Sequence, residues 1–331
     1  MSTSRRDILR MGMAGLLTGG LVGCGANSDK KVLRIAYVSG PSELLHEAAE
    51  KIAEQIESDS KGQIEVRLYP SGQLGNDREL IEGLRLGGID MVISGLAVVG
   101  WYAPQYGMVE APFLWRDYEH INRVWGGPLG LEIRNAMLQS ADLTLHEPWF
   151  RGPRYLTTTS KIIQHPDDLV GMKLRVPELE VYIKSWQTFG ANVTPIPFTD
   201  MFMALKLGVV EGQENPLATI YGNSLHEVQK YIMETKHLIG FYIPATGPYM
   251  AKRFTHEEQA LIMRALAVAT RFHNDTVASS EADYKKKLEA AGVEFVAIDN
   301  KPFRSIARKK IPQQFADSWK AGMYEAISEA R

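Results

Sequence analysis

The chain has 331 residues, of which 45% are hydrophobic and 23% are charged, and its formal net charge is -2. This composition is typical of a folded protein that is large enough for two domains. The nearly balanced charge gives no basic surface of the kind that binds nucleic acid, so no nucleic-acid partner is expected. The sequence has no run of about 18 apolar residues, so no membrane-spanning helix is expected either.

The first residues have the pattern of an export signal. Arg5 and Arg6 precede an uncharged run over residues 11–23, which is too short and too rich in glycine for an anchor helix. The paired arginines resemble signals of the twin-arginine route, and a general secretory signal is the alternative. We expect residues 1–23 to be removed on export.

Cys24 is the only cysteine of the chain, and it ends the segment LVGC, which looks like a bacterial lipobox. We expect cleavage before Cys24 and attachment of lipid to its thiol; the alternative is that Cys24 is discarded with the signal. A single cysteine forms no intramolecular disulfide. We then expect residues 24–31 to form a flexible tether that would hold an exported, periplasmic protein at the membrane by its lipid.

Predicted strands and helices alternate in the first part of the chain after this tether. Strand patterns cover residues 31–39, 63–70 and 89–95, and amphipathic helix patterns cover 42–56 and 77–86. This alternation predicts a parallel sheet that is covered by helices.

The same alternation returns after residue 140. The predicted strands and helices cover residues 141–150, 173–177, 181–190, 200–208 and 209–216. The last hundred residues are predicted to be mostly helical. The periodic stretch 255–292 exceeds the usual length of a globular helix, which favours one long helix shared by two lobes.

Arg175 stands at the carboxyl end of the predicted strand 173–177, and Pro177 ends that strand. Ligands of open α/β sheets bind outside the carboxyl ends of the strands. A guanidinium group there matches the two oxygens of a carboxylate. Arg175 is therefore a candidate carboxylate-binding residue, although a surface arginine in a salt bridge fits its position equally well.

Three further residues are candidates for the same site. Arg154 follows a glycine–proline turn, and a solvated loop arginine is the alternative. Asn215 lies between Gly212 and Pro216, and its amide can donate and accept hydrogen bonds at once, although a plain turn asparagine fits too. Of the nearby aromatic residues only Phe198 is expected in a pocket, because such residues usually lie in the core.

Motifs of enzymes and metal sites are missing from the sequence. It has no nucleophile elbow, HExxH motif, phosphate-binding loop or dinucleotide-binding motif. None of its eight histidines pairs with another at metal-ligand spacing on a predicted helix. We therefore expect no catalytic residues, no metal and no cofactor.

Several long segments together resemble the solute-binding proteins of tripartite ATP-independent periplasmic (TRAP) transporters, of the DctP type. The resemblance covers nearly all of the chain after the tether. It is carried by the segments RLYPSGQLGNDRELIEGLRLGGIDM (67–91), EAPFLW (110–115), RGPRYLTT (151–158), DDLVGMKLRVPE (167–178), GANVTPIPFTDMFMALKLGVVEGQENPL (190–217) and HEVQKY (226–231).

This resemblance implies a two-lobed α/β clamshell of the periplasmic-binding-protein kind, with crossover strands and a long helix that spans both lobes. Lobe I is expected to contain residues 32–151 and about 240–279, and lobe II residues 152–239 and about 280–331. A monomer that delivers its ligand to the membrane permease subunits is expected.

The ligands of this family are mostly organic acids. By resemblance, Arg175 forms the main salt bridge to the ligand carboxylate and Arg154 makes a second contact. Phe198 and Asn215 match further binding positions of the family.

Two positions differ from the sialic-acid binders of this family. Glu178 stands where those proteins have asparagine, and Gly95 stands where they have an acidic side chain. A carboxylate at Glu178 would accept hydrogen bonds from hydroxyl groups and repel a second acid group. We therefore favour a hydroxylated monocarboxylate such as a hexuronate or an aldonate. A C4-dicarboxylate or keto-acid binder, a periplasmic sugar-acid lyase and a sensory binding protein are the alternatives.

Overall fold

The computed structural model describes residues 30–330. The predicted export signal, Cys24 and nearly all of the tether lie outside these residues. Within the described chain, no helix combines the length and the apolar character that a bilayer crossing requires.

The first sheet contains the three parallel strands that the sequence predicts. β1 pairs in parallel with β2 and with β3, and α1 (Leu44–Asp59) and α2 (Asp77–Leu86) connect them. The sheet has the order β2-β1-β3-β11-β4, and β5 also pairs with β11. Its strands are β1 (Lys31–Ala36), β2 (Ile64–Tyr69), β3 (Met91–Gly95), β4 (Thr144–Leu145), β5 (Trp149–Pro153) and β11 (Ile239–Thr246).

The predicted strand over residues 141–150 is wrong. Helix α5 (Pro128–Ala141) includes the first residue of this range. Two short strands, β4 and β5, follow it, and Pro148 lies between them. Both strands pair with β11. Because proline has no backbone N–H to donate, Pro148 interrupts the ladder that an unbroken strand would form.

The second sheet has the order β12-β10-β6-β9-β7-β8. β7 is parallel to β8 and β9, whereas β6 is antiparallel to β9 and β10. A Cβ atom on Gly212 would lie 2.4 Å from the carbonyl oxygen of Thr157, so β9 can approach β6 only with glycine there. The strands are β6 (Tyr155–Thr158), β7 (Lys173–Val176), β8 (Asn192–Pro195), β9 (Gly212–Asn215), β10 (Tyr231–Met233) and β12 (Glu294–Val296).

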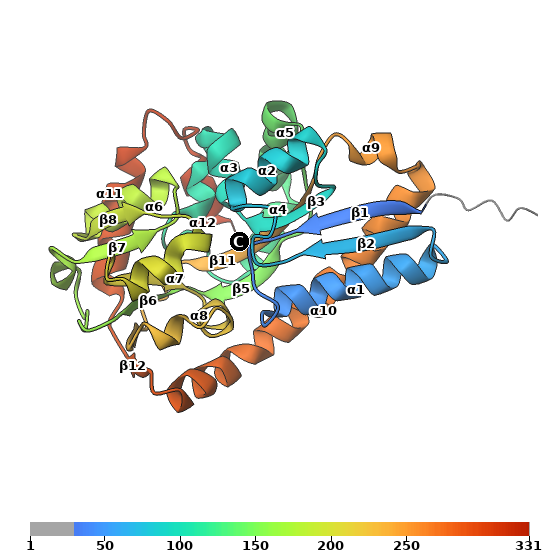
Figure 1. Cartoon of the computed structure of the whole chain (residues 1–331). Helices are drawn as coiled ribbons and strands as arrows, with labels where there is room; N and C mark the ends of the chain where they lie inside the picture. Colours follow the sequence, from blue (N-terminus) through green and yellow to red (C-terminus); the bar gives the residue numbers. More distant parts are fainter. Residues whose placement is uncertain (1–29, 331) are drawn as a thin grey trace, which may run out of the picture.

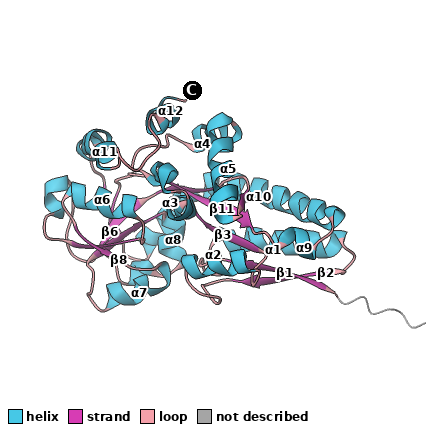
Figure 2. Cartoon of the chain, turned by 90° about the horizontal axis from the view of Figure 1, so that it is seen from above, coloured by secondary structure: helices cyan, strands magenta, loops and turns pink. Residues whose placement is uncertain are grey.

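Helices cover both faces of the two sheets, which lie side by side in Figure 2. Besides the helices already named they are α3 (Ala97–Tyr102), α4 (Tyr118–Gly126), α6 (Glu180–Phe189), α7 (Phe198–Lys206), α8 (Leu217–Gly222), α9 (Met250–Arg253), α10 (His256–Ala290), α11 (Lys301–Gln314) and α12 (Met323–Glu329), with three short 3₁₀ helices, η1 (Pro104–Glu110), η2 (Pro166–Leu169) and η3 (Leu225–Glu227).

The long helix α10 contacts both lobes, as expected from the sequence. Thr255 caps its start, where its side chain accepts a hydrogen bond from the backbone N–H of Glu258. Its apolar residues, such as Ile262 and Leu266, share a core with residues of α1 such as Ile52. Farther along, α10 packs on α8, and Figure 1 shows it extending from α1 towards β12.

Each sheet with its helices forms one lobe, and β5 leads directly into β6 of the other sheet. The residue limits given above for the lobes remain a proposal. At the end of the described chain, α12 lies on α4: a ring nitrogen of His120 is 2.9 Å from the carbonyl oxygen of Ile327. Arg116 also donates a hydrogen bond to the carbonyl oxygen of Ser328. The C-terminal residues therefore contact the first lobe.

Candidate ligand-binding cleft

A cleft between the two lobes brings together most of the predicted site residues. It encloses about 670 Å³ of empty space, including its open mouth. Arg175, Arg154, Asn215, Phe198 and Gly95 all line it. Five residues that lie far apart in the sequence thus meet where strands of both sheets end, as expected for an α/β binding protein.

Arg175 lies in β7 and is buried, with 2% of its surface exposed. Its Nε donates a hydrogen bond to the carbonyl oxygen of Ile196 at 2.8 Å. No carboxylate oxygen in residues 30–330 lies within 4.0 Å of its guanidinium group. Burial lowers the pKa of Arg175 to about 10, so the group is charged at neutral pH. Arg175 therefore brings to the cleft a positive charge that has no ion-pair partner among the described residues, while the more distant charges of Glu214 and Asp77 act on it.

Arg154 is also buried, but a carboxylate of the protein pairs with it. Its Nε lies 2.5 Å from Oε2 of Glu214, and its Nη2 lies 2.7 Å from Oε1. Burial would raise the pKa of Glu214, but the charge of Arg154 and hydrogen bonds from Arg154 and His237 hold it at about 2. The predicted role of Arg154 as a ligand contact stays a prediction, and its charge is already neutralised by Glu214.

Asn215 and Phe198 lie in the second lobe. Asn215 is buried at the end of β9, and its Nδ2 donates a hydrogen bond to Oε1 of Gln213 at 2.6 Å. Phe198 is half-buried at the start of α7. These positions allow the amide and the aromatic ring to contact a ligand, as the resemblance implies.

Gly95 ends β3 on the opposite side of the cleft. The nearest atoms to a Cβ placed on it would be 4.0 Å away, at the backbone of Ala97 and Phe241. The backbone packing therefore does not require glycine here. Instead, the missing side chain leaves room in the cleft.

Glu178 is exposed and does not line the main cleft, so the predicted contact of its carboxylate with a ligand stays a prediction. It borders a smaller recess that it shares with Arg175 and Phe198. Its backbone carbonyl accepts hydrogen bonds from Nη2 of Arg78 at 3.1 Å and from Nε1 of Trp101 at 3.2 Å. Both donors belong to the first lobe, so this carbonyl connects the lobes across the mouth of the cleft.

Two acids in the cleft, the half-buried Asp77 and the buried Glu110, are not identified by the sequence analysis. Oδ1 of Asp77 accepts a hydrogen bond from Ser94 at 2.8 Å, and Oε2 of Glu110 accepts one from Tyr182 at 2.6 Å. Burial raises the pKa of both carboxyl groups, and nearby arginines, Arg151 among them, partly oppose this rise. Both acids lie in segments that carry the resemblance, but no local pattern distinguishes them from surface acids.

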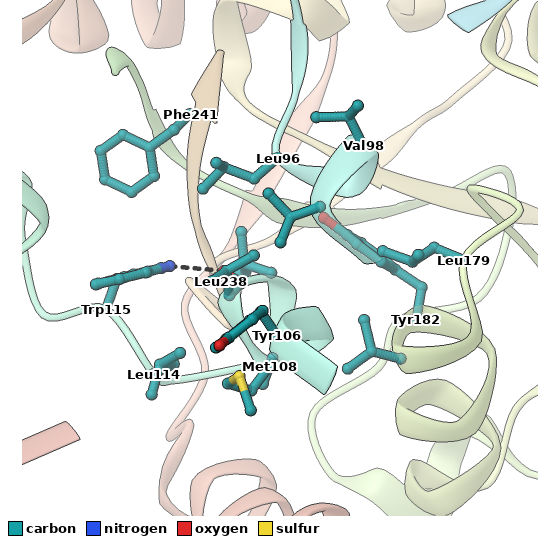
Figure 3. Close-up of a cluster of buried hydrophobic side chains, with 14 of the residues drawn as sticks. Leu96, Val98, Tyr106, Met108, Leu114, Trp115, Leu179, Tyr182, Leu238 and Phe241 are labelled. Carbon is teal, nitrogen blue, oxygen red and sulfur yellow. Dashed lines mark hydrogen bonds between the residues drawn. The ribbon is translucent and has the colours of Figure 1, made fainter. Parts of the chain in front are cut away.

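The apolar wall of the cleft belongs to a core shared by both lobes. Figure 3 shows Tyr182 and Leu179 of the second lobe near Leu96 and Val98 of the first. Tyr182 and Phe241 of this core also line the cleft. The aromatic surface gives the uncharged part of a ligand an apolar face to contact.

The lobes are also joined beside the cleft. The buried carboxylate of Glu43 in the first lobe accepts hydrogen bonds from Thr219 at 3.1 Å and from Asn223 at 2.8 Å, both in or next to α8. With the contacts of the Glu178 carbonyl, these bonds show that the structure has the two lobes closed on each other.

Two α/β lobes joined by crossing strands and closed over a charged cleft define a two-lobed solute-binding protein. The chain belongs to the DctP family, described as bacterial extracellular solute-binding protein family 7, whose sequence model matches residues 35–318. This finding confirms the resemblance to periplasmic TRAP solute-binding proteins, which are binding proteins rather than enzymes.

Two relatives in sequence agree with this assignment. A solute-binding protein of Roseobacter denitrificans is 31% identical over 291 residues, which cover 88% of this chain and 89% of the relative. The sialic acid-binding periplasmic protein SiaP of Vibrio cholerae is 29% identical over 272 residues, which cover 82% of this chain and 84% of SiaP.

Solved structures share the whole fold. A TRAP periplasmic solute-binding protein of Roseobacter denitrificans with bound L-galactonate has a TM-score of 0.84 and 28% identity, covering 91% of this chain and 98% of that one. One from Ochrobacterium anthropi with bound L-fuconate has a TM-score of 0.84 and 28% identity, and the match covers 90% of this chain and 98% of that one. One from Pseudomonas putida with bound D-glucuronate has a TM-score of 0.81 and 27% identity, and the match covers 91% of this chain and 97% of that one.

Proposed function

We propose that this protein binds a hydroxylated monocarboxylate, such as an aldonate or a hexuronate, in the periplasm and delivers it to a TRAP membrane permease. The observation that carries the proposal is the buried guanidinium group of Arg175, which has no carboxylate partner among residues 30–330. A solute carboxylate would supply the missing charge and accept two parallel hydrogen bonds.

The other charges of the cleft favour one acid group on the ligand. Glu214 neutralises Arg154, so Arg154 offers less to a second carboxylate than Arg175 offers to the first. Asp77 and Glu110 each use one oxygen within the protein, in the hydrogen bonds to Ser94 and Tyr182. Their other oxygens can accept hydrogen bonds from hydroxyl groups, and in their ionised form the two groups oppose a further carboxylate. The repulsion of a second acid group on the ligand, which was expected from Glu178, is thus better assigned to Asp77 and Glu110.

Three of the similar structures support this ligand class, whereas others of the same fold hold succinate or sn-glycerol-3-phosphate. The ligands in the three proteins described above are L-galactonate, L-fuconate and D-glucuronate, and each is a sugar acid with one carboxylate and several hydroxyl groups. Aldonates and uronates combine the features that the cleft can recognise, namely one anionic group for Arg175 and hydroxyl groups for the acids.

A thermal-shift screen tests the proposal. The purified protein is unfolded and refolded to remove any bound solute, then heated with uronates, aldonates, C4-dicarboxylates and keto acids. A ligand raises the unfolding temperature according to RT ln(1 + [L]/Kd). We expect uronates or aldonates to give the largest increases in unfolding temperature. Calorimetry with the best ligand should show one binding site per protein molecule. Preferential stabilisation by succinate or by a keto acid would contradict the proposal.

Delivery to the permease and the position at the membrane complete the proposal. The closed lobes would present the loaded protein to the permease, and lipid on Cys24 would hold it close to the membrane surface. Radioactive palmitate incorporation in the producing bacterium, compared between the wild-type protein and Cys24→Ser, tests the lipid anchor. Equal labelling of the two proteins would contradict it.

A further inference from the structure

Arg151 is a second cation of the cleft that the sequence analysis does not identify. It lies in β5 of the first sheet and lines the same cleft as Arg175. Its Nη2 donates a hydrogen bond to Oγ1 of Thr219 at 3.1 Å, and its guanidinium group lies 3.9 Å from the centre of the Tyr242 ring. Its Nε is buried and has no hydrogen-bond partner among the described residues. The group is thus held in place while part of its donor capacity is unused.

Arg151 and Arg175 line the same cleft, and each also borders a different recess. Arg175 also borders the recess at the mouth, which it shares with Trp101 and Glu178. Arg151 borders a different recess, which lies beneath α8 and α10. A solute whose carboxylate binds Arg175 therefore lies in the same enclosed space as Arg151.

We propose that Arg151 determines specificity by donating hydrogen bonds to hydroxyl oxygens at the end of the sugar acid remote from its carboxylate. This inference rests on the proposed function. Because Thr219 and the face of Tyr242 already fix the guanidinium group, ligand binding immobilises little further side-chain freedom.

The surrounding charges favour a hydroxyl group over a second carboxylate at Arg151. The half-buried Asp77 and the buried Glu110 both lie close enough for the charge of Arg151 to oppose the rise in the pKa of their carboxyl groups, as Arg175 does for Asp77 and Arg154 for Glu110. In their ionised form these acids offset the charge of Arg151 and would repel another anion. A hydroxyl group can instead donate to a carboxylate and accept from the guanidinium group at the same time.

Calorimetry with two acids of different length tests this role. L-galactonate, with six carbons, reaches farther from its carboxylate than D-erythronate, with four. The wild-type protein, Arg151→Gln and Arg151→Lys are titrated with L-galactonate, and weak binding of D-erythronate is measured by displacement. We expect Arg151→Gln to weaken L-galactonate binding by about tenfold or more and D-erythronate binding by less than about threefold. Arg151→Lys should lose less affinity for L-galactonate, because lysine keeps the positive charge but lacks the planar set of donors of the guanidinium group.

Arg175→Lys is the matched control, because it changes the carboxylate end and should weaken both acids by the same factor. Equal losses for the two acids in Arg151→Gln, or no loss, would overturn the role of Arg151 and leave the proposed function standing. A wild-type protein that binds a dicarboxylate and neither sugar acid would overturn both. Melting curves of the ligand-free variants report folding. If Arg151→Gln does not fold, the affinities of Arg151→Lys for the two acids test the role instead. Failure of both variants to fold would overturn the inference in favour of a structural role.

Discussion

Arg154 and Glu214 form a buried ion pair with two contacts, 2.5 Å between Nε and Oε2 and 2.7 Å between Nη2 and Oε1. Arg175 lines the same cleft without such a partner in the described part of the chain. The two arginines were expected to share one task, the binding of a ligand carboxylate. The structure gives them different surroundings, since one charge is satisfied within the protein and the other is open to a solute.

Glu214→Gln should strongly destabilise the protein. The change leaves the Arg154 charge buried with no anionic partner, and breaking a buried pair in this way costs roughly 3–5 kcal/mol. Urea unfolding measures the loss of free energy. Glu178→Gln is the control, because this exposed side chain should change stability by no more than about 0.5 kcal/mol. Equal stabilities of the two variants would show that the Arg154–Glu214 pair contributes little.

Ligand affinity should depend on pH through Arg175. Its pKa is lowered to about 10 by burial, and a bound carboxylate favours the charged form. The affinity should therefore be constant from neutral pH towards about 10 and fall above it, by about tenfold per pH unit once the free guanidinium group is deprotonated. Calorimetry across this range measures it, with circular dichroism at each pH to confirm folding. An affinity that rises with pH would contradict the assignment.

Gly95→Ala should reduce affinity without reducing stability. A Cβ atom there meets no atom closer than 4.0 Å, but it projects into space that the ligand would use. Thermal unfolding without ligand should be unchanged, and calorimetry should show weaker binding. Gly126→Ala is the matched control, because its added Cβ also meets nothing within 4 Å and lies outside the cleft. Unchanged affinity in Gly95→Ala would show that the ligand does not approach the end of β3.

Arg78→Ala should weaken binding by favouring open lobes. Arg78 donates to the Glu178 carbonyl across the mouth of the cleft and stacks on Trp101 at 4.5 Å. The loss of one such hydrogen bond, about 0.5–1.5 kcal/mol, predicts a decrease in affinity of roughly 2- to 10-fold, mostly as faster dissociation in stopped-flow experiments. Arg67→Ala removes an exposed arginine that pairs with Glu65 instead, and it should leave dissociation unchanged. Identical dissociation rates in the two variants would argue against a role for this contact in closure.

Local patterns predict much of the fold. The alternation of strands and helices before residue 95 identifies β1, β2 and β3, and the long periodic stretch identifies α10. The antiparallel strand β11 is missed, because it pairs with β3 from about 150 positions away and its residues lie in a mostly helical region. Nothing in a local pattern encodes such a distant pairing. The error at residues 141–150 has a local cause. Pro148 is a signal against an unbroken strand, and the prediction of one strand over these residues did not take it into account.

The candidate site is predicted where a residue has a distinctive local context. Arg175 precedes a strand-ending proline and Asn215 lies between glycine and proline, and both line the cleft. Asp77, Glu110 and Arg151 have no such context, and only tertiary structure shows which charged side chains face inwards. For Glu178, the backbone carbonyl makes the contact between the lobes while the carboxylate is exposed. Sequence reasoning about side-chain chemistry cannot anticipate such a role.

The affinity of Arg175→Ala for the ligand found in the screen tests the central claim most directly. Calorimetry should show a loss of roughly 3–5 kcal/mol, which is several hundred-fold or more in Kd, with a weak remnant in Arg175→Lys. If Arg175→Ala folds and binds the same acid as tightly as the wild-type protein, the solute carboxylate binds elsewhere and the account of the cleft is wrong.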